Sequence, residues 1–265
     1  SYAGTSLALD GSTYYWRIKF WDTLGAQGAV SATQNFTMNS PSNTPSLDSP
    51  TNTATNQSLL PALKTTGTDT NSDYLRYKIE LCEDVGMSVS CQTFNQTSSQ
   101  TGWSGQNAQT STAYTSGTQA TYTLQSALSV NTTYYWRSYS IDPGGSNAWS
   151  STQATPYSFT TTTAPTRQSD CRISEASDDS QNTIIWTDVS SNEDYFQVDR
   201  STDASAWSTL SSTIPANSSS YIDSTITAEH TYYYRVAPYL SGGPTYGEWC
   251  YTDTLTQNLG SFKIN

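Results

Sequence analysis

The chain has 265 residues, of which 34% are hydrophobic and 12% are charged, and its formal net charge is −11. Its 8 Trp, 19 Tyr and 6 Phe residues argue against a disordered chain, because disordered segments lack large groups whose burial offsets chain entropy. The negative charge opposes binding to nucleic acid, which depends on Lys and Arg. No apolar run approaches the ~20 residues that cross a bilayer. We therefore expect neither a nucleic-acid partner nor a membrane span.

A short aromatic strand occurs three times along the chain. Its copies begin at Tyr14, Tyr134 and Tyr232, about 100 residues apart, which is the length of one β-sandwich. Side chains alternate between two faces in each copy, as in an antiparallel sheet that buries one side. The repeat predicts an all-β protein of tandem immunoglobulin-like sandwiches, and no segment has sustained helical spacing.

Residues 1–38 are expected to hold only the last strands of a sandwich. One face of the first aromatic strand carries Tyr14, Trp16, Ile18 and Phe20. Two or three such strands are not stable alone in water, because the apolar face must be covered and the open edge paired. Two explanations are open. The missing strands belong to a preceding segment that was cut off, or another chain donates them by β-augmentation, which implies a polymer or a tight partner.

Residues 39–44, rich in Ser, Pro and Asn, form a predicted linker to a complete sandwich over residues 45–162. An early loop of this sandwich carries Asp69, Asn71 and Asp73 at alternate positions. Closely spaced oxygen ligands suit Ca²⁺, so these residues are a candidate calcium site, although the loop lacks the Gly and the distant Glu of an EF-hand. The alternative is an ordinary turn in which Asn and Asp bond their own backbone. No other cofactor is indicated.

A third repeat spans residues 163–258, and residues 259–265 are either a tail or one more strand. Ile184-Ile185-Trp186 and the alternating run from Asn192 to Ser201 resemble the second and third strands of fibronectin type III domains. An apolar residue six positions before the second and third aromatic strands resembles the latter half of these domains. The resemblance covers nearly the whole chain and implies tandem fibronectin type III β-sandwiches, the first one incomplete.

The resemblance also implies roles for particular aromatic residues. Tyr14, Tyr134 and Tyr232 match the tyrosine corner, in which the hydroxyl bonds to backbone a few residues upstream. Two Trp residues follow strand arginines, and the pairs resemble the Trp/Arg ladders of cytokine-receptor sandwiches. We expect a Trp ring over the guanidinium in each: the pairs are Arg137 with Trp149 and Arg235 with Trp249.

The four cysteines fall into two pairs by position. Cys82 and Cys91 flank the end of a predicted hairpin, whereas Cys171 and Cys250 lie near the start and end of the third repeat. Neither pair has the spacing of a zinc site. Two disulfides are expected, as in extracellular proteins, and four free buried thiols are the alternative.

Few residues offer catalytic chemistry. His230 is the only histidine, and no Gly-x-Ser-x-Gly elbow occurs, so no enzyme is expected. Trp103, in a loop of small residues, is the candidate contact for a surface glycan. The sequence predicts a non-enzymatic extracellular repeat protein of a microbial surface or filamentous appendage, whose partners are copies of itself or adjacent domains. The alternative is a carbohydrate-binding or adhesin segment of a larger secreted enzyme.

Overall fold

The computed structural model describes residues 4–98, 101–104, 114–175, 180–227, 230–242, 245–253 and 255–256. They divide into two compact units, residues 1–125 with 132–160, and residues 126–131 with 161–265. Among the described residues the only helix is a short 3-10 turn, Gln96–Ser98, and the other elements are β-strands. No described helix has the length and apolar character needed to cross a bilayer.

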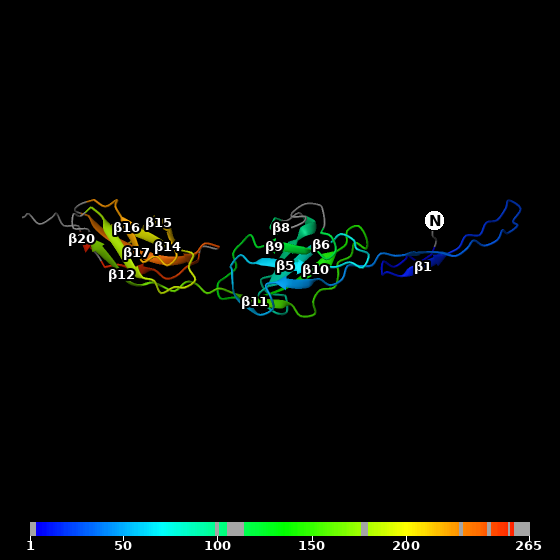
Figure 1. Ribbon diagram of the computed structural model, residues 1–265, viewed down its shortest axis with the longest axis horizontal. Coiled ribbons are helices and arrows are strands. Elements are labelled where there is room, and N and C mark those ends of the chain that lie inside the picture. The colour runs from blue at the N-terminus through cyan, green and yellow to red at the C-terminus, as the bar shows by residue number, and fades with distance from the viewer. Residues whose placement is uncertain are drawn as a thin grey trace, which may run out of the picture. The chain divides into compact units, whose positions relative to one another are not determined.

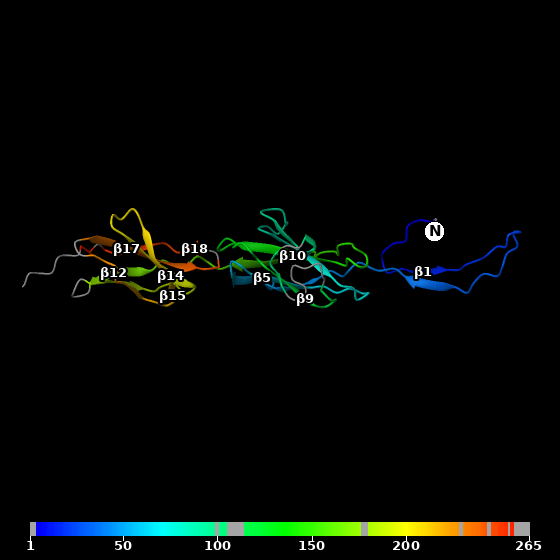
Figure 2. The same cartoon turned by 90° about the horizontal axis from the view of Figure 1, so that it is seen from above.

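The first unit contains a two-stranded antiparallel ribbon, which we call the N-terminal hairpin. It consists of β1 (Thr13–Trp16) and β2 (Gln34–Thr37), joined by a long loop (Figures 1 and 2). Strand β1 ends at Trp16, whereas the sequence alternation continues to Phe20, because the chain leaves the ladder for the loop. Within the described part of the chain β1 pairs with β2 alone.

The rest of the first unit is a sandwich of two antiparallel sheets. One sheet has the order β3-β5-β9-β8, and the other has the order β4-β11-β10-β6-β7. The strands of the first sheet are β3 (Ser46–Ser49), β5 (Ala62–Thr66), β8 (Trp103–Ser104) and β9 (Gln119–Thr123). Those of the second sheet are β4 (Ala54–Gln57), β6 (Arg76–Cys82), β7 (Gln92–Asn95), β10 (Thr133–Ile141) and β11 (Tyr157–Thr161).

The core of this sandwich is built from alternate residues of its strands. Tyr77 and Ile79 of β6 and Trp136 of β10 are each 0% exposed. The next residues along each strand face outward and carry the charges, such as Lys78 and Glu80. This alternation is the one that the sequence predicts for an antiparallel sheet with one buried face.

The second unit is a sandwich with sheet orders β12-β13-β16 and β15-β14-β17-β18, and β19 and β20 also pair with β17. Its first sheet comprises β12 (Ser169–Glu175), β13 (Asn182–Thr187) and β16 (Ser220–Asp223). Its second sheet comprises β14 (Tyr195–Ser201), β15 (Ser208–Pro215), β17 (Thr231–Leu240), β18 (Thr245–Tyr246), β19 (Cys250–Tyr251) and β20 (Leu255–Thr256). Trp186, Phe196 and Tyr234 lie in its core.

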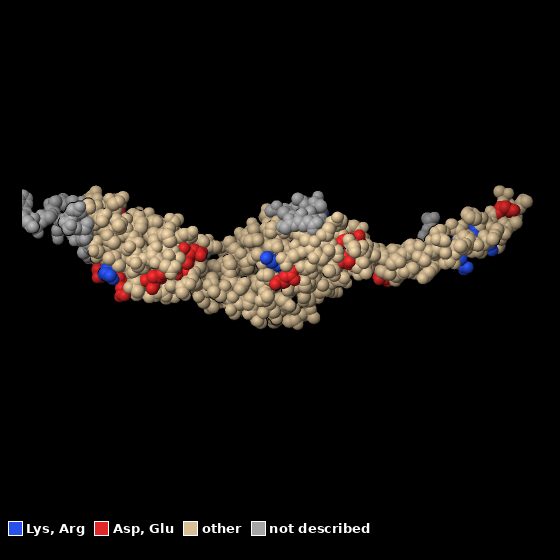
Figure 3. Space-filling model, in the orientation of Figure 1, with Lys and Arg blue, Asp and Glu red and all other residues tan. Residues whose placement is uncertain are grey.

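The surface is largely uncharged. On the face drawn in Figure 3, Lys and Arg are few and lie apart from one another, and the acidic groups form small separate clusters. Residues that are neither acidic nor basic therefore make up most of what this face presents.

Candidate functional site

The N-terminal hairpin has the same pairing register as the last two strands of the following sandwich, β10 and β11. Tyr14 lies opposite Phe36 in the hairpin, and Tyr134 lies opposite Phe159 in the β10–β11 pair. The ring centroids are 6.0 Å apart in the first pair and 5.9 Å apart in the second. A hydroxyl pair one step along the ladder is also repeated, at 3.0 Å in the hairpin and 2.9 Å in the sandwich. The hairpin therefore matches the β10–β11 pair in register and in ring stacking.

Equivalent side chains differ sharply in exposure between these two pairs of strands. Trp16 and Phe36 of the hairpin are 43% and 42% exposed, whereas their counterparts Trp136 and Phe159 are both 0% exposed. The local pairing is the same, so the difference comes from the strands that cover β10 and β11. The hairpin has an aromatic core face and lacks the described residues that would cover it.

The exposed apolar surface continues into the loop that joins β1 and β2. Its large side chains are exposed as follows: Ile18 41%, Phe20 70%, Trp21 58% and Leu24 93%. We refer to these exposed side chains, with Trp16 and Phe36, as the hairpin face. Monomeric proteins seldom present so many large apolar groups together unless the patch binds something.

A free strand edge adjoins the hairpin face. In the sandwich, the second edge of β10 pairs with β6, so that Trp136 lies opposite Leu81 and Ser138 lies opposite Ile79. The corresponding edge of β1 has no described partner. Its backbone N–H and C=O groups are open to an incoming antiparallel strand.

The predicted tyrosine corners lie as follows. The Tyr14 hydroxyl accepts a hydrogen bond from the Ala8 amide at 3.3 Å, and the Tyr232 hydroxyl accepts one from the Thr227 amide at 2.9 Å. Tyr134 is 3% exposed and stacks on Phe159. The hydroxyls of Tyr14 and Tyr232 therefore close the turn before their strands, and these corners belong to the packing of the fold.

Arg235 lies between two indole rings in the second unit. Its guanidinium carbon is 4.0 Å from the centroid of Trp249 and 4.6 Å from that of Trp207. Asp199 accepts hydrogen bonds from Arg235 at 2.9 and 2.7 Å. The sequence reasoning paired Arg235 with Trp249 and missed Trp207, which reaches the site from the loop between β14 and β15.

The ladder predicted for Arg137 and Trp149 is wrong. Trp149 bridges Ile141, two positions beyond Tyr139, and its ring lies 5.2 Å from the Lys78 ammonium. Arg137 lies opposite Glu80, and their side chains form an ion pair at 2.8 Å. Burial alone would raise the pKa of Glu80, but the hydrogen bonds from Arg137 and Tyr139 outweigh it and lower that pKa. The strand register cannot be seen in the sequence. In the structure it places Trp149 opposite Ile141 and not beside Arg137.

Both expected disulfides are present. Cys82 and Cys91 are joined across the β6–β7 hairpin, with a sequence separation of 9. Cys171 of β12 and Cys250 of β19 are joined over a sequence separation of 79 and connect the two sheets of the second unit. These covalent links are typical of proteins that fold in an oxidising compartment.

Trp103 is not a surface contact, and the expectation that it is exposed is wrong. It is 2% exposed, and its ring lies 5.2 Å from that of Tyr122, opposite it in the β8–β9 ladder. Gly102 allows this approach because its φ is +107° and a Cβ there would lie 2.7 Å from the Thr123 carbonyl oxygen. The small residues beside Trp103 therefore serve close packing.

The predicted calcium residues are only partly brought together. Asp69 and Asp73 lie with Asp142, a residue just after β10, and carboxylate oxygens of the three are within 4.8 Å of one another. Asn71 points elsewhere: its side-chain oxygen accepts hydrogen bonds from the Ser40 amide and hydroxyl at 3.0 and 2.9 Å. Asp142 was missed because it is far from the loop in sequence.

Three solved structures of fibronectin type III segments are similar to this chain. One is the FN1–FN3 segment of chicken CNTN1, with 13% identity, 94% of this chain and 77% of that chain covered, and a TM-score of 0.37. A two-domain segment of chicken tenascin has 12% identity, 82% and 99% coverage, and a TM-score of 0.33. An Fn3-like protein from Clostridium thermocellum has 20% identity, 34% and 94% coverage, and a TM-score of 0.30. No protein-family model and no curated protein matches the sequence.

The strand order of the two complete sandwiches decides the fold. Each has one sheet built on its first, second and fifth main strands, β3-β5-β9 and β12-β13-β16. The other sheet is β7-β6-β10-β11 in the first unit and β15-β14-β17, continued by the last short strands, in the second. The chain is a tandem of fibronectin type III-like β-sandwiches. Strand β4 and strand β8 are additions at sheet edges of the first one.

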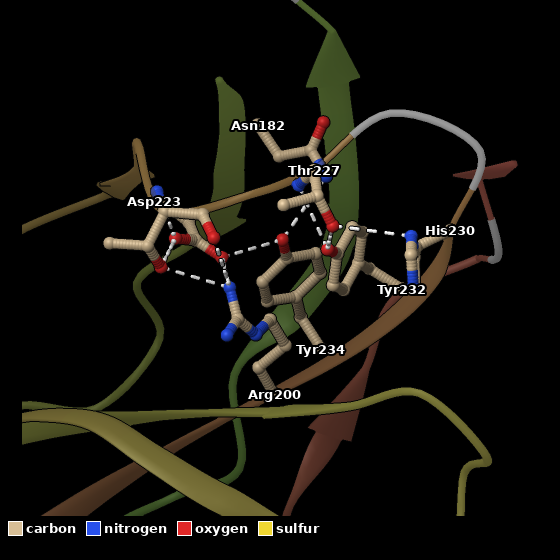
Figure 4. A network of polar contacts seen from close by, with 8 residues as sticks. Asn182, Arg200, Asp223, Thr227, His230, Tyr232 and Tyr234 are labelled. Atoms are coloured by element: carbon tan, nitrogen blue, oxygen red, sulfur yellow. Dashed lines mark hydrogen bonds and ion pairs between the residues drawn. The ribbon is translucent and has the colours of Figure 1, made fainter. Parts of the chain in front are cut away.

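A polar network connects residues from the two sheets of the second unit (Figure 4). Tyr234 donates a hydrogen bond to Asp223 at 2.8 Å and accepts one from Asn182 at 3.1 Å. Arg200 pairs with the same Asp223 oxygen at 2.8 Å. Thr225 donates to the other oxygen from its amide at 2.9 Å and from its hydroxyl at 2.6 Å.

The network sets the pKa values of its members. Burial alone would raise the pKa of Asp223, but hydrogen bonds from Thr225, Tyr234 and Arg200 outweigh it and lower that pKa. Burial is also the main cause that raises the pKa of Tyr234. A carboxylate that accepts four hydrogen bonds is held ionised as a structural anchor. His230 stands at the rim, where its Nδ1 is 3.2 Å from the Thr227 hydroxyl.

Asp223→Ala is expected to lower the free energy of unfolding by about 2–4 kcal/mol at pH 7, because it leaves Arg200 and Tyr234 without their acceptor. The folded state lowers the pKa of Asp223, so its stabilisation is present above the unfolded-state pKa and is lost as the pH falls through the folded-state pKa. Urea denaturation at pH 7 and pH 3 measures both effects. The difference between wild type and variant should shrink at pH 3, whereas Asp253→Ala, at an exposed residue, should change little.

Proposed function

We propose that this chain is a non-enzymatic structural and adhesive repeat protein of an extracellular surface or appendage, and that copies join through the N-terminal hairpin. The exposed aromatic core face of β1–β2 carries the proposal, because the equivalent face of β10–β11 is fully covered. An antiparallel strand from a second copy, added at the free edge of β1 as β6 adds to β10, would cover it. Two disulfides and an all-β repeat architecture support an extracellular setting.

The size of the hairpin face is sufficient for such a joint. Each aromatic side chain presents about 150–250 Å² when fully exposed. Trp16, Phe20, Trp21 and Phe36 are about half exposed on average, so covering them removes roughly 300–500 Å² from water. At ~25 cal/mol per Å² this gives about 7–12 kcal/mol, comparable with the entropic cost of association. Backbone hydrogen bonds along the β1 edge would add specificity of register.

Phe36→Asp is expected to abolish self-association of the full chain, because it places a charge in the face that must be covered. Sedimentation and electron micrographs over a range of protein concentrations should show oligomers or filaments for the wild type and monomers for this variant. Val189→Asp is the control, since Val189 is 45% exposed and Phe36 is 42% exposed. A wild-type chain that stays monomeric at high concentration would contradict joining through a second copy.

The carbohydrate-binding alternative has lost the residue on which it was based. Trp103 lies inside the first fibronectin type III-like sandwich, and Trp207 and Trp249 flank Arg235. Indole rings that are stacked on a guanidinium stiffen the sheet, and no observation favours a sugar ligand for them.

A further inference from the structure

We propose that Asp69, Asp73, Asp142 and Asn39 bind a calcium ion, which ties the segment after the hairpin to two loops of the first complete sandwich. Asn39 lies between β2 and β3, the first two aspartates lie between β5 and β6, and Asp142 follows β10. The proposal is independent of whether the hairpin recruits a second copy.

The spacing of the carboxylates fits a shared cation. Their oxygens lie within 4.8 Å of one another. Calcium binds oxygen at about 2.3–2.6 Å, so two of its ligands can be up to about 5 Å apart. Asn39 is in contact with the same group, because its side-chain amide donates a hydrogen bond to Asp73. The site offers three acidic side chains and one amide from three separate segments.

Two buried oxygen atoms at this place lack a hydrogen-bond donor. They are Asp69 Oδ2 and Asn39 Oδ1. Asp69 is only 6% exposed, and its other oxygen accepts hydrogen bonds from the Asn71 and Asp73 amides at 2.7 and 3.2 Å. A buried acceptor with no partner destabilises the fold, and more so when it is charged. A bound cation would satisfy both oxygens at once.

The charges of the site are also unbalanced. The ion pairs among the described residues involve Glu80, Asp199 and Asp223, and none includes the three aspartates. Asp142 is 0% exposed, and its oxygens accept the amides of Gly145 and Ser146 at 2.6 and 2.8 Å. Clustered buried carboxylates repel one another unless a positive charge lies between them.

The donor set favours calcium over other metals. All four side chains offer oxygen, which hard cations prefer, whereas zinc and copper sites use His and Cys. Mg²⁺ demands near-octahedral geometry and usually keeps several waters, whereas Ca²⁺ accepts irregular sets of six to eight oxygens. Gly145 leaves the space open, because a Cβ there would overlap Asp142 and Asn39.

A calcium ion at this place would restrict the linker. Ser40 is already bonded to Asn71, and the Asn43 amide donates to the Thr68 carbonyl at 2.9 Å. The ion would add Asn39 to these contacts and connect the hairpin segment directly to the loop that follows β10. Calcium would thereby make the connection between repeats stiffer.

Calorimetric titration of the full chain with CaCl₂ after EDTA treatment tests the site. We expect one ion per chain with a Kd of roughly 10⁻⁴–10⁻³ M, the range of extracellular calcium modules. Calcium at ~100 times Kd should raise the Tm of the first unit by about 5–10 °C. Absence of binding at millimolar calcium, or an equal response to MgCl₂ alone, would overturn the proposal.

Asp73→Asn is the informative variant, because it removes one carboxylate charge from the site. It leaves Asp142 in place, which accepts the Gly145 and Ser146 amides. It should weaken calcium binding at least about tenfold and still give the wild-type Tm in EDTA or a higher one. Glu83→Gln is the matched control, since it removes one charge from an exposed residue of the same unit. Equal calcium affinity of Asp73→Asn and wild type would contradict the assignment.

Hydrogen exchange tests the role of Asn39 separately. Calcium should slow exchange of the Ser40 amide in the wild type, and Asn39→Ala should lose most of this protection. If the chain binds calcium but exchange of the Ser40 amide does not change, the assignment of Asn39 as a ligand is contradicted.

Discussion

Replacing Trp136 by alanine is expected to lower the free energy of unfolding of the first sandwich by about 3–5 kcal/mol. Trp136 is 0% exposed and lies opposite Leu81 in the β10–β6 ladder. The variant would lose the transfer free energy of a large indole ring and would leave a cavity in a close-packed core. Urea denaturation followed by tryptophan fluorescence and circular dichroism measures the loss.

Trp16→Ala is the matched control for this prediction. Trp16 has the same place in the repeated strand pair but is 43% exposed. In the monomer we expect a change of less than about 1 kcal/mol, as for most surface positions. A loss as large as that of Trp136→Ala in the monomer would mean that something in the chain already covers the hairpin face. The same substitution should weaken self-association, so the two measurements separate folding from joining.

The strand pattern of this chain could be predicted from sequence because it is local. Alternation in the three aromatic strands identified Tyr14, Tyr134 and Tyr232 as equivalent positions, and the equal registers of β1–β2 and β10–β11 follow from the same residues. Side chains alternate with a period of two in any strand, so a face can be assigned without the rest of the fold. The cysteine pairs could be predicted for a related reason, since they lie near the ends of a hairpin or of a repeat, which an antiparallel sandwich brings together.

The remaining site residues depend on contacts between distant segments. Asp142 joins Asp69 and Asp73 only because the loop after β10 returns beside the loop before β6. Trp103 seemed free to reach solvent in a loop of small residues, yet a two-residue pairing with β9 turns its ring inward. Trp149 was assigned to Arg137 from a resemblance in sequence order, whereas ladder register brings it to Lys78. Register and loop return are not encoded in any local pattern.

Removal of the Cys171–Cys250 disulfide is expected to destabilise the second sandwich by about 4–5 kcal/mol. The bond closes a loop with a sequence separation of 79, and in the chain-entropy model a loop of this length restricts the unfolded state by that amount. It also joins β12 of one sheet to β19 of the other, so its loss removes the covalent connection between the two sheets. The double variant Cys171→Ala with Cys250→Ala avoids free thiols, and urea denaturation of the full chain gives its free energy of unfolding.

The Cys82–Cys91 disulfide provides the comparison within the same chain. Its sequence separation is 9, so the same model gives about 2–3 kcal/mol for Cys82→Ala with Cys91→Ala. The hairpin that it closes is also held by the β6–β7 ladder, from Lys78 opposite Asn95 to Leu81 opposite Gln92. The loss in free energy of unfolding should therefore be larger for the longer loop. The two losses should also appear in different units, the second for Cys171–Cys250 and the first for Cys82–Cys91. Equal losses, or a larger loss for the short loop, would show that native packing around the sulfur atoms, and not chain entropy, sets the stabilisation.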